Sequence, residues 1–185
     1  MPVLIIILVI AVILVVMLIG TYNKLVGLRN GVESSWRQVD VQLQKRYDLV
    51  PNLVETVKGY AKHEQETLEK VIEARNMAMN ANGVHDQQAA ENMLTGTLKS
   101  LFALSESYPD LKANQNFLML QQELASIENK IAYSRQHYND VVRGYNTVQQ
   151  QFPANMVAPM AGARPAEYFE LENEAAREAP KVSFN

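Results

Sequence analysis

The sequence predicts an all-α protein: an N-terminal transmembrane helix, an antiparallel four-helix bundle with long helices, and an irregular C-terminal tail. Three observations predict it. Residues 3–19 form an unbroken apolar run, and apolar residues recur at spacings of three and four between residues 22 and 152. Glycine and proline are sparse in the middle of the chain, and the prolines gather after Phe152. We therefore expect an anchor at residues 1–21, a bundle at 22–152 and a tail at 153–185.

The apolar run has about the minimum length of a membrane span, and residues 1–20 as a helix extend roughly 30 Å, the thickness of a bilayer core. A cleaved signal peptide is disfavoured, because no Lys or Arg precedes the run and Leu18 occupies a position that a cleavage site gives to a small residue. A buried core helix would be apolar on every face. Both remain alternatives to the favoured uncleaved anchor.

No basic residue precedes the apolar run. Five follow it: Lys24, Arg29, Arg37, Lys45 and Arg46. Because basic loops stay on the cytoplasmic side, we expect a single-pass protein of the inner (cytoplasmic) membrane, with the N-terminus outside and the folded part in the cytoplasm. The lack of cysteine agrees weakly with a reducing compartment.

The composition limits the partners. The net charge of −3 argues against nucleic acid as a main ligand, because a surface that follows phosphates needs a basic excess. The basic residues after the run are interspersed with Glu33, Asp40 and Asp48, which is a weaker pattern than a polybasic lipid-binding cluster. The chain beyond the anchor is long enough for one domain with a real core.

The first bundle helix is expected at residues 22–47 and the second at 52–79. The stretch 46–52 should separate them, because Pro51 removes a helical hydrogen bond and disfavours helical geometry at Val50. Asp48 can cap the second of these helices. The apolar phase nevertheless runs on through Val54 and Val57, so one kinked continuous helix is an alternative.

The third helix is expected at 86–107, after a turn at Gly83, and the fourth at 112–151. The fourth has a seven-residue repeat that predicts left-handed packing in a bundle or coiled coil. Its apolar positions are Phe117, Leu120, Leu124, Ile127, Ile131, Tyr138, Val141, Tyr145, Val148 and Phe152. In the tail we expect a short helix at residues 166–177.

No constellation for catalysis or metal binding emerges. A di-iron site needs Glu three residues before His, but Tyr60, Asn82 and Ser134 stand before the three histidines. The stretch 63–67 begins like a zinc-protease helix, yet Thr67 replaces its second histidine. Without cysteine or a glycine-rich phosphate loop, we predict no enzyme activity, no catalytic residues, no cofactor and no metal.

The chain resembles the LemA family. The resemblance is carried by residues 22–30 (YNKLVGLRN), 36–43 (WRQVDVQL), 46–57 (RYDLVPNLVETV), 59–64 (GYAKHE) and the tail at 168–169 and 175–184. It implies an N-terminal span, a cytoplasmic four-helix bundle and no established catalytic activity. Magnetosome membrane proteins of the same family suggest scaffold-like roles, and other members look associated with membrane peptidases.

We therefore expect a non-enzymatic, membrane-anchored interaction or scaffold protein that self-associates at the cytoplasmic face. The alternative is an accessory or regulatory subunit of a membrane enzyme such as a peptidase. Expected partners are the lipid bilayer and further copies of the chain, with another membrane protein as a candidate and no nucleic acid.

Two groups of residues are candidates for the functional site. Those at the expected helix junction would either cap and orient the helices or contact a partner: Arg46, Tyr47, Asp48, Pro51 and Asn52. The aromatic residues of the tail would dock either onto their own bundle or onto a partner: Tyr168, Phe169 and Phe184.

Overall fold

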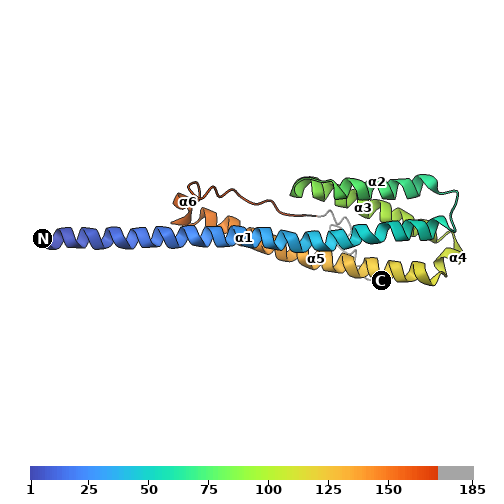
Figure 1. Ribbon diagram of the computed structural model, residues 1–185, viewed down its shortest axis with the longest axis horizontal. Coiled ribbons are helices and arrows are strands. Elements are labelled where there is room, and N and C mark those ends of the chain that lie inside the picture. Colours follow the sequence, from blue (N-terminus) through green and yellow to red (C-terminus); the bar gives the residue numbers. More distant parts are fainter. Residues whose placement is uncertain (171–185) are drawn as a thin grey trace, which may run out of the picture. The chain divides into compact units, whose positions relative to one another are not determined.

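The computed structural model describes residues 1–170 and is all-helical over that range, which confirms the predicted fold class (Figure 1). Its helices are α1 (Pro2–Lys58), α2 (Gln65–Met79), α3 (Val84–Ser105), α4 (Pro109–Lys112), α5 (Gln115–Gln150) and α6 (Ala154–Val157).

The chain divides into two compact units, and both long helices contribute to each. The first unit holds residues 1–43 and 127–168, which are most of α1, most of α5 and α6. The second holds residues 44–126 together with Phe169 and Glu170 of the described tail.

In the first unit, the N-terminal stretch of α1 is uncovered. Its large apolar side chains between Val3 and Ile19 are 42% to 68% exposed. The best eighteen-residue window of α1 has a mean hydropathy of 3.7, which makes α1 the one candidate membrane span among the described helices. The alternative of a helix buried in a protein core is therefore wrong for this stretch.

Further along, α1 and α5 pack as an antiparallel pair within the same unit. The Trp36 and Tyr138 rings lie 5.2 Å apart, centroid to centroid, and Val148 packs near Leu25. Gly31 faces Val141, whose Cγ1 would lie 3.7 Å from a Cβ added to the glycine.

Of the ten predicted apolar positions of the repeat on α5, six are buried, Leu120, Val141 and Val148 are partly buried, and Phe152 is exposed. Val142 is fully buried while Val141 is only partly so. A straight helix drifts against a strict seven-residue repeat, and this drift moves the buried face by one residue. Phe152 is 73% exposed because α5 ends at Gln150.

The second unit is a four-helix assembly of the ends of α1 and α5 with α2 and α3; α2 and α3 lie side by side (Figure 1). Phe102 and Phe117 meet edge to face with centroids 6.2 Å apart. The most deeply buried apolar residues of this unit include Val50, Leu53, Val57, Val71, Leu94, Leu101 and Leu111.

The predicted break at residues 46–52 is wrong: α1 runs through Pro51 to Lys58, and the turn to α2 lies at residues 59–64. The alternative of one continuous helix is the correct one. Burial explains it, because Val50, Leu53 and Val57 are 0% exposed and would leave the core if the helix stopped.

The hydrogen bond that Pro51 withholds is replaced from another helix. A residue at position 51 would donate its N–H to the carbonyl of Tyr47, four residues earlier, and proline has no N–H. Arg75 of α2 donates its Nε–H to this carbonyl at 2.8 Å. The buried acceptor is thus satisfied, and α2 is fixed against α1 at the proline.

Two other boundaries differ from expectation. α3 covers Val84–Ser105 and α5 covers Gln115–Gln150, so both begin or end a few residues away from the predicted limits. Residues 166–170 of the expected tail helix are not helical, and the rest of that helix lies outside the described residues.

Because the Arg75 hydrogen bond replaces the one that Pro51 withholds, the effects of substitutions at these two positions should depend on each other. Arg75→Met should destabilise the protein by about 1–3 kcal/mol, because the Tyr47 carbonyl loses its partner. In a Pro51→Ala background the loss should be smaller, since the backbone of the introduced alanine supplies the missing N–H. Thermal unfolding followed by far-ultraviolet circular dichroism measures both. Lys70→Met on the exposed face of α2 is the control, and equal losses in the two backgrounds would show that Arg75 does not replace the bond.

Candidate functional site

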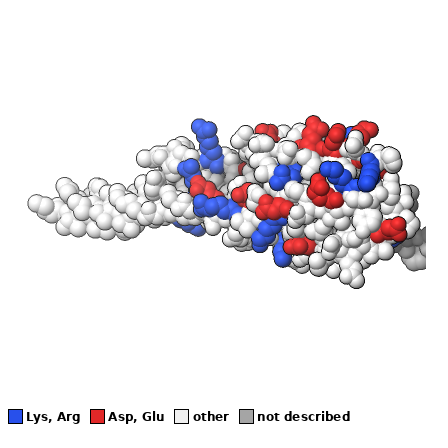
Figure 2. Space-filling view, turned by 45° about the vertical axis from the view of Figure 1, so that its right-hand side comes forward, with Lys and Arg blue, Asp and Glu red and all other residues white. Residues whose placement is uncertain are grey.

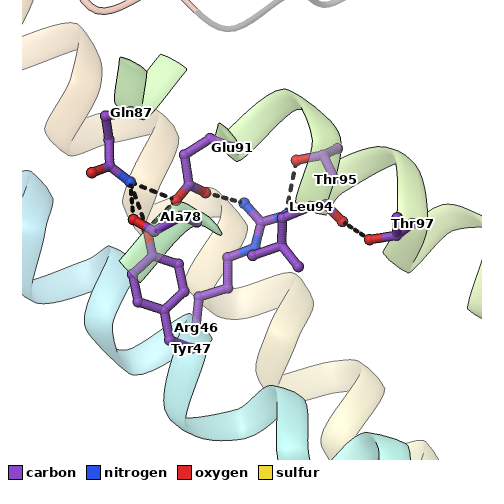
Figure 3. Close-up of polar contacts among 8 residues, drawn as sticks. All are labelled: Arg46, Tyr47, Ala78, Gln87, Glu91, Leu94, Thr95 and Thr97. Carbon is purple, nitrogen blue, oxygen red and sulfur yellow. Dashed lines mark hydrogen bonds and ion pairs between the residues drawn. The ribbon is translucent and has the colours of Figure 1, made fainter. Parts of the chain in front are cut away.

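The most distinctive site is a buried polar cluster between α1, α2 and α3 in the second unit (Figure 3). Arg46 and Tyr47 are neighbours on α1. Gln87, Glu91 and Thr95 stand four residues apart on α3, which places them on one face of that helix. We call these five residues the polar cluster.

An ion pair forms the centre of the polar cluster. Arg46 Nη1 lies 3.0 Å from Glu91 Oε2, and both residues are 0% exposed. Arg46 Nη2 also donates to Thr95 Oγ1 at 2.8 Å. A charge buried to this degree is stable only when an opposite charge and hydrogen bonds replace its hydration. Here the positive Arg46 and the negative Glu91 are buried together.

Tyr47 and Gln87 complete the polar cluster. The Tyr47 hydroxyl donates to Glu91 Oε1. Gln87 Nε2 donates to the Tyr47 hydroxyl oxygen at 2.8 Å, to Glu91 Oε1 at 3.1 Å and to the carbonyl of Ala78 at 3.1 Å. Since Ala78 belongs to the last turn of α2, the cluster ties three helices together.

Electrostatics hold the Tyr47 phenol in its neutral form. Burial, followed by the nearby Glu91 carboxylate, raises the pKa of Tyr47 far above its ordinary value. The phenol is therefore a hydrogen-bond donor at any physiological pH. Its role in the cluster is to donate to the carboxylate, and it is not poised to exchange a proton near neutrality.

The arrangement aligns helices and is closed to solvent. The four residues Arg46, Tyr47, Gln87 and Glu91 are at most 8% exposed. Their hydrogen bonds are directional, so sliding α3 along α1 would separate the charges. This is a device for fixing helix register, and a substrate has no access to its charged atoms.

The five residues of the predicted junction do not form one site. Arg46 and Tyr47 face the interior and belong to the polar cluster. Asp48 is exposed and accepts a hydrogen bond from Gln44 Nε2 at 2.8 Å. Asn52 is exposed, and its carbonyl accepts from Thr56 Oγ1 at 2.8 Å. Pro51 is partly exposed.

Sequence reasoning missed the α3 side of the polar cluster and Arg75. A signal for it exists: Gln87 and Glu91 fall in phase with Ala90, Leu94 and Leu98, the buried positions of α3. A carboxylate on the buried face of a helix needs a buried cation, and Arg46, next to the buried Tyr47 on α1, was available for that role.

The described part of the tail is attached to its own protein. In the first unit, the Tyr138 hydroxyl donates to the Glu167 carbonyl at 2.8 Å, and the Asn146 side chain exchanges two hydrogen bonds with the backbone of Ala166, at 2.9 and 2.8 Å. Phe169, in the second unit, is 0% exposed, whereas Tyr168 is 40% exposed. Phe184 lies outside the described residues.

A groove of about 1080 Å³ opens on the second unit between the end of α1 and α2. Apolar side chains and charged ones both line it: Pro51, Val54, Glu55, Lys58, Lys62, Gln65, Leu68, Glu69, Ile72, Glu73, Asn76, Met77 and Asn80. We call it the α1–α2 groove. Pro51 is thus the one predicted junction residue that contributes to an accessible hollow.

Within residues 1–170, no three His, Cys, Asp or Glu side chains come together as metal ligands. The absence of a metal, a cofactor and enzyme activity stays a prediction from the sequence.

The exposed apolar stretch and the helical assembly define an all-helical class of protein with one N-terminal candidate membrane span. A model of the LemA family matches residues 35–184, and the chain belongs to that family.

Several relatives are similar over much of the chain. Protein LemA of Metamycoplasma hominis is 25% identical over 144 residues, covering 76% of this chain and 64% of the relative. Magnetosome protein MamQ 2 of Paramagnetospirillum magneticum is 24% identical over 192 residues, covering 88% and 71%. Magnetosome protein MamQ of Magnetospirillum gryphiswaldense is 22% identical over 178 residues, covering 82% and 65%. The chain therefore spans less than two thirds of the length of the Metamycoplasma relative.

Breaking the buried ion pair should be costly. Glu91→Leu leaves the Arg46 charge buried without its carboxylate and should lower the free energy of unfolding by about 3–5 kcal/mol. Removing both charges in Arg46→Met/Glu91→Leu should cost clearly less than the sum of the two single changes. Chemical unfolding of the purified protein measures all three. Glu66→Leu, which removes the exposed Glu66–Lys70 pair, should change stability by less than about 1 kcal/mol; additive losses at 46 and 91 would contradict the coupling.

Stability should fall at alkaline pH. Burial, with Glu167 nearby, raises the pKa of Tyr138 from 10.0 to about 12, and the pKa of Tyr47 is raised as well. Above pH 10 the unfolded chain releases these protons while the folded protein retains them, so stability decreases as pH rises. Thermal unfolding midpoints of Tyr47→Phe and Tyr138→Phe should depend less on pH between 10 and 12. Profiles of the two variants that run parallel to the wild-type profile would refute the assignment.

Proposed function

We propose that this protein is a membrane-anchored, non-enzymatic interaction or scaffold protein that self-associates at the cytoplasmic face of the inner membrane. The observation that carries the proposal is a contrast within the second unit. The two buried charged groups, Arg46 and Glu91, are enclosed in the polar cluster and paired with each other. The accessible hollow is instead a groove walled by two helices, a form suited to binding an apolar segment.

The membrane part of the proposal is supported by the exposed apolar stretch of α1 and by the relatives named as magnetosome proteins. The cytoplasmic orientation is supported by the basic residues that follow the stretch, beginning with Lys24 and Arg29.

A second copy of the chain is the occupant that we propose for the α1–α2 groove. The second unit also carries apolar side chains that project outward from α5: Leu118 is 41% exposed and Met119 is 64% exposed. One molecule thus offers both a groove and an apolar projection. A contact between different patches of two copies is heterologous, so it propagates into rings or open arrays, as a scaffold requires.

Confinement to a membrane favours such a contact. Anchors in one bilayer raise the effective concentration of the attached domains, so a weak lateral contact suffices for assembly. The α1–α2 groove has charged residues of both signs beside its apolar ones, Lys58 and Lys62 against Glu69 and Glu73, which favours a partner of mixed surface over a strongly charged one.

Self-association through the α1–α2 groove has a matched test on α2. Met77 lines the groove and Met79 does not, although the two side chains are 46% and 44% exposed. Met77→Glu should reduce the assembly of the full-length protein to monomers, and Met79→Glu should not. The mass of each variant extracted in mild detergent is the measurement.

Mixing two variants sharpens the result. Met77→Glu has a defective groove and Met119→Glu has a defective projection, so each variant should be monomeric alone. Their mixture should form dimers, because the projection of Met77→Glu can still bind the groove of Met119→Glu. A wild-type protein that is monomeric at all concentrations would refute self-association. If the wild-type protein instead carries a different protein, and Met77→Glu loses that protein, the self-association proposal would be replaced by the role of an accessory subunit.

A further inference from the structure

The segment around α6 packs one face onto α1 in the first unit. Ala154, Val157 and Ala158 are buried together with Leu25, and Val148 and Ala163 pack against them. Leu25 stands six residues beyond Ile19, the end of the apolar run, which is roughly 9 Å along a helix. Figure 1 shows α6 beside α1 where the uncovered N-terminal stretch ends.

The opposite face of the same segment is also apolar, but nothing covers it in the described chain. Phe152, Met156 and Met160 are 73%, 65% and 84% exposed. They stand four residues apart in the sequence, one before α6, one within it and one after it; the segment is held in turns by the bonds from Met156 N–H to the Pro153 carbonyl and from Ala161 N–H to the Val157 carbonyl.

This concentration is unlike the rest of the described surface. After Ile19, the five most exposed large hydrophobic residues are Met160, Tyr133, Phe152, Met156 and Met119. Three of them lie within nine residues of sequence, whereas the other two stand apart on α5. Single exposed hydrophobic residues are ordinary, but a cluster on one short segment indicates a surface that is covered in use.

The helix register places this cluster at the end of the candidate membrane span. In the antiparallel pair of α1 and α5, Gly31 faces Val141 and Leu25 lies near Val148. The same register puts Gln150, the last residue of α5, opposite Tyr22 and Asn23, and Phe152 follows two residues later in the chain. Tyr22 and Val26 of α1 add exposed apolar surface there, at 42% and 37%.

Basic side chains also lie near the end of the candidate membrane span. Lys24 and Arg29 of α1 are joined by Arg143 of α5 and Arg164 of the tail, all of them exposed. Arg29 and Arg143 have acidic neighbours on their own helices. Lys24 and Arg164 have none in any ion pair of the described residues, so the local charge is positive. Figure 2 shows Lys and Arg side chains gathered where the apolar stretch ends.

We propose that residues 152–160 are a membrane-contact element that inserts Phe152, Met156 and Met160 into the headgroup region of the bilayer that α1 spans, with Lys24 and Arg164 beside anionic lipid headgroups. The proposal rests on the proposed anchoring by α1 and adds a second, non-spanning contact with lipid. Apolar side chains flanked by basic ones are the composition that binds at a bilayer surface, and proximity to a span makes the insertion intramolecular.

The absence of cysteine makes a direct test possible. Single-cysteine variants of the full-length protein, Met156→Cys and Met160→Cys, would carry a nitroxide label in nanodiscs of phosphatidylcholine with phosphatidylglycerol. Power saturation reports collisions with oxygen, which concentrates in lipid, and with a nickel chelate, which stays in water. Tyr133→Cys is the matched control, because Tyr133 is 75% exposed and belongs to the same unit and helix pair. Val9→Cys reports on the span itself.

The labels at 156 and 160 should collide more with oxygen and less with nickel than the label at 133. Omitting phosphatidylglycerol should reduce the difference, as should Lys24→Gln/Arg164→Gln. Water-like values at 156 and 160 with lipid-like values at 9 would overturn the membrane-contact element and leave the anchor intact. Low collision rates with both reagents would mean that protein covers the segment, which also overturns it. Water-like values at 9 would overturn the anchoring and the contact together.

Discussion

A proline inside α1 withholds one hydrogen bond, and the second unit is organised around the place where that bond is missing. Pro51 leaves the Tyr47 carbonyl without its helical donor, and Arg75 of α2 supplies one. The side chain of the same Tyr47 donates to Glu91 of α3. One residue of α1 therefore holds α2 with its backbone and α3 with its side chain. Without the replacement bond, the continuity of α1 past the proline would cost a buried, unsatisfied acceptor.

Sequence periodicity predicted the helices well because the helices follow their apolar faces. It failed at residues 46–52. There the local preference of proline to end a helix competed with the burial of the apolar residues that follow it. The apolar phase through Val54 and Val57 was the correct indicator, and its energetic weight exceeds that of one lost bond because several side chains are buried with it. Arg75 could not be assigned from the sequence, since it stands in an ordinary helix with nothing local to mark its distant acceptor.

Only the α1 residues of the polar cluster were predicted from the sequence, and those of α3 were missed. Arg46 and Tyr47 were identified through the stretch in which they lie, but the stretch as a whole faces two ways. Neighbouring residues on a helix point in different directions, so Asp48 and Asn52 cannot share the interior with Arg46. Glu91 was the stronger clue, because a carboxylate in phase with leucines cannot be buried without a partner. Phe152 was assigned to the core by its repeat, and only the end of α5 at Gln150 shows that it faces outward.

The polar cluster and the open surfaces of this protein differ in what they expose. An active site keeps charged groups accessible, whereas the two charged groups of the polar cluster, Arg46 and Glu91, are enclosed and paired with each other. The open surfaces carry apolar side chains: the α1–α2 groove in one unit, where charged residues stand beside them, and the surface of residues 152–160 in the other. Exposed apolar surface is costly in water, and that cost is recovered when another surface covers it. A fold that specifies its helix register by a buried ion pair, and leaves apolar side chains uncovered, is therefore suited to binding; lipid at one surface and a second copy of the chain at the other are the partners that we propose.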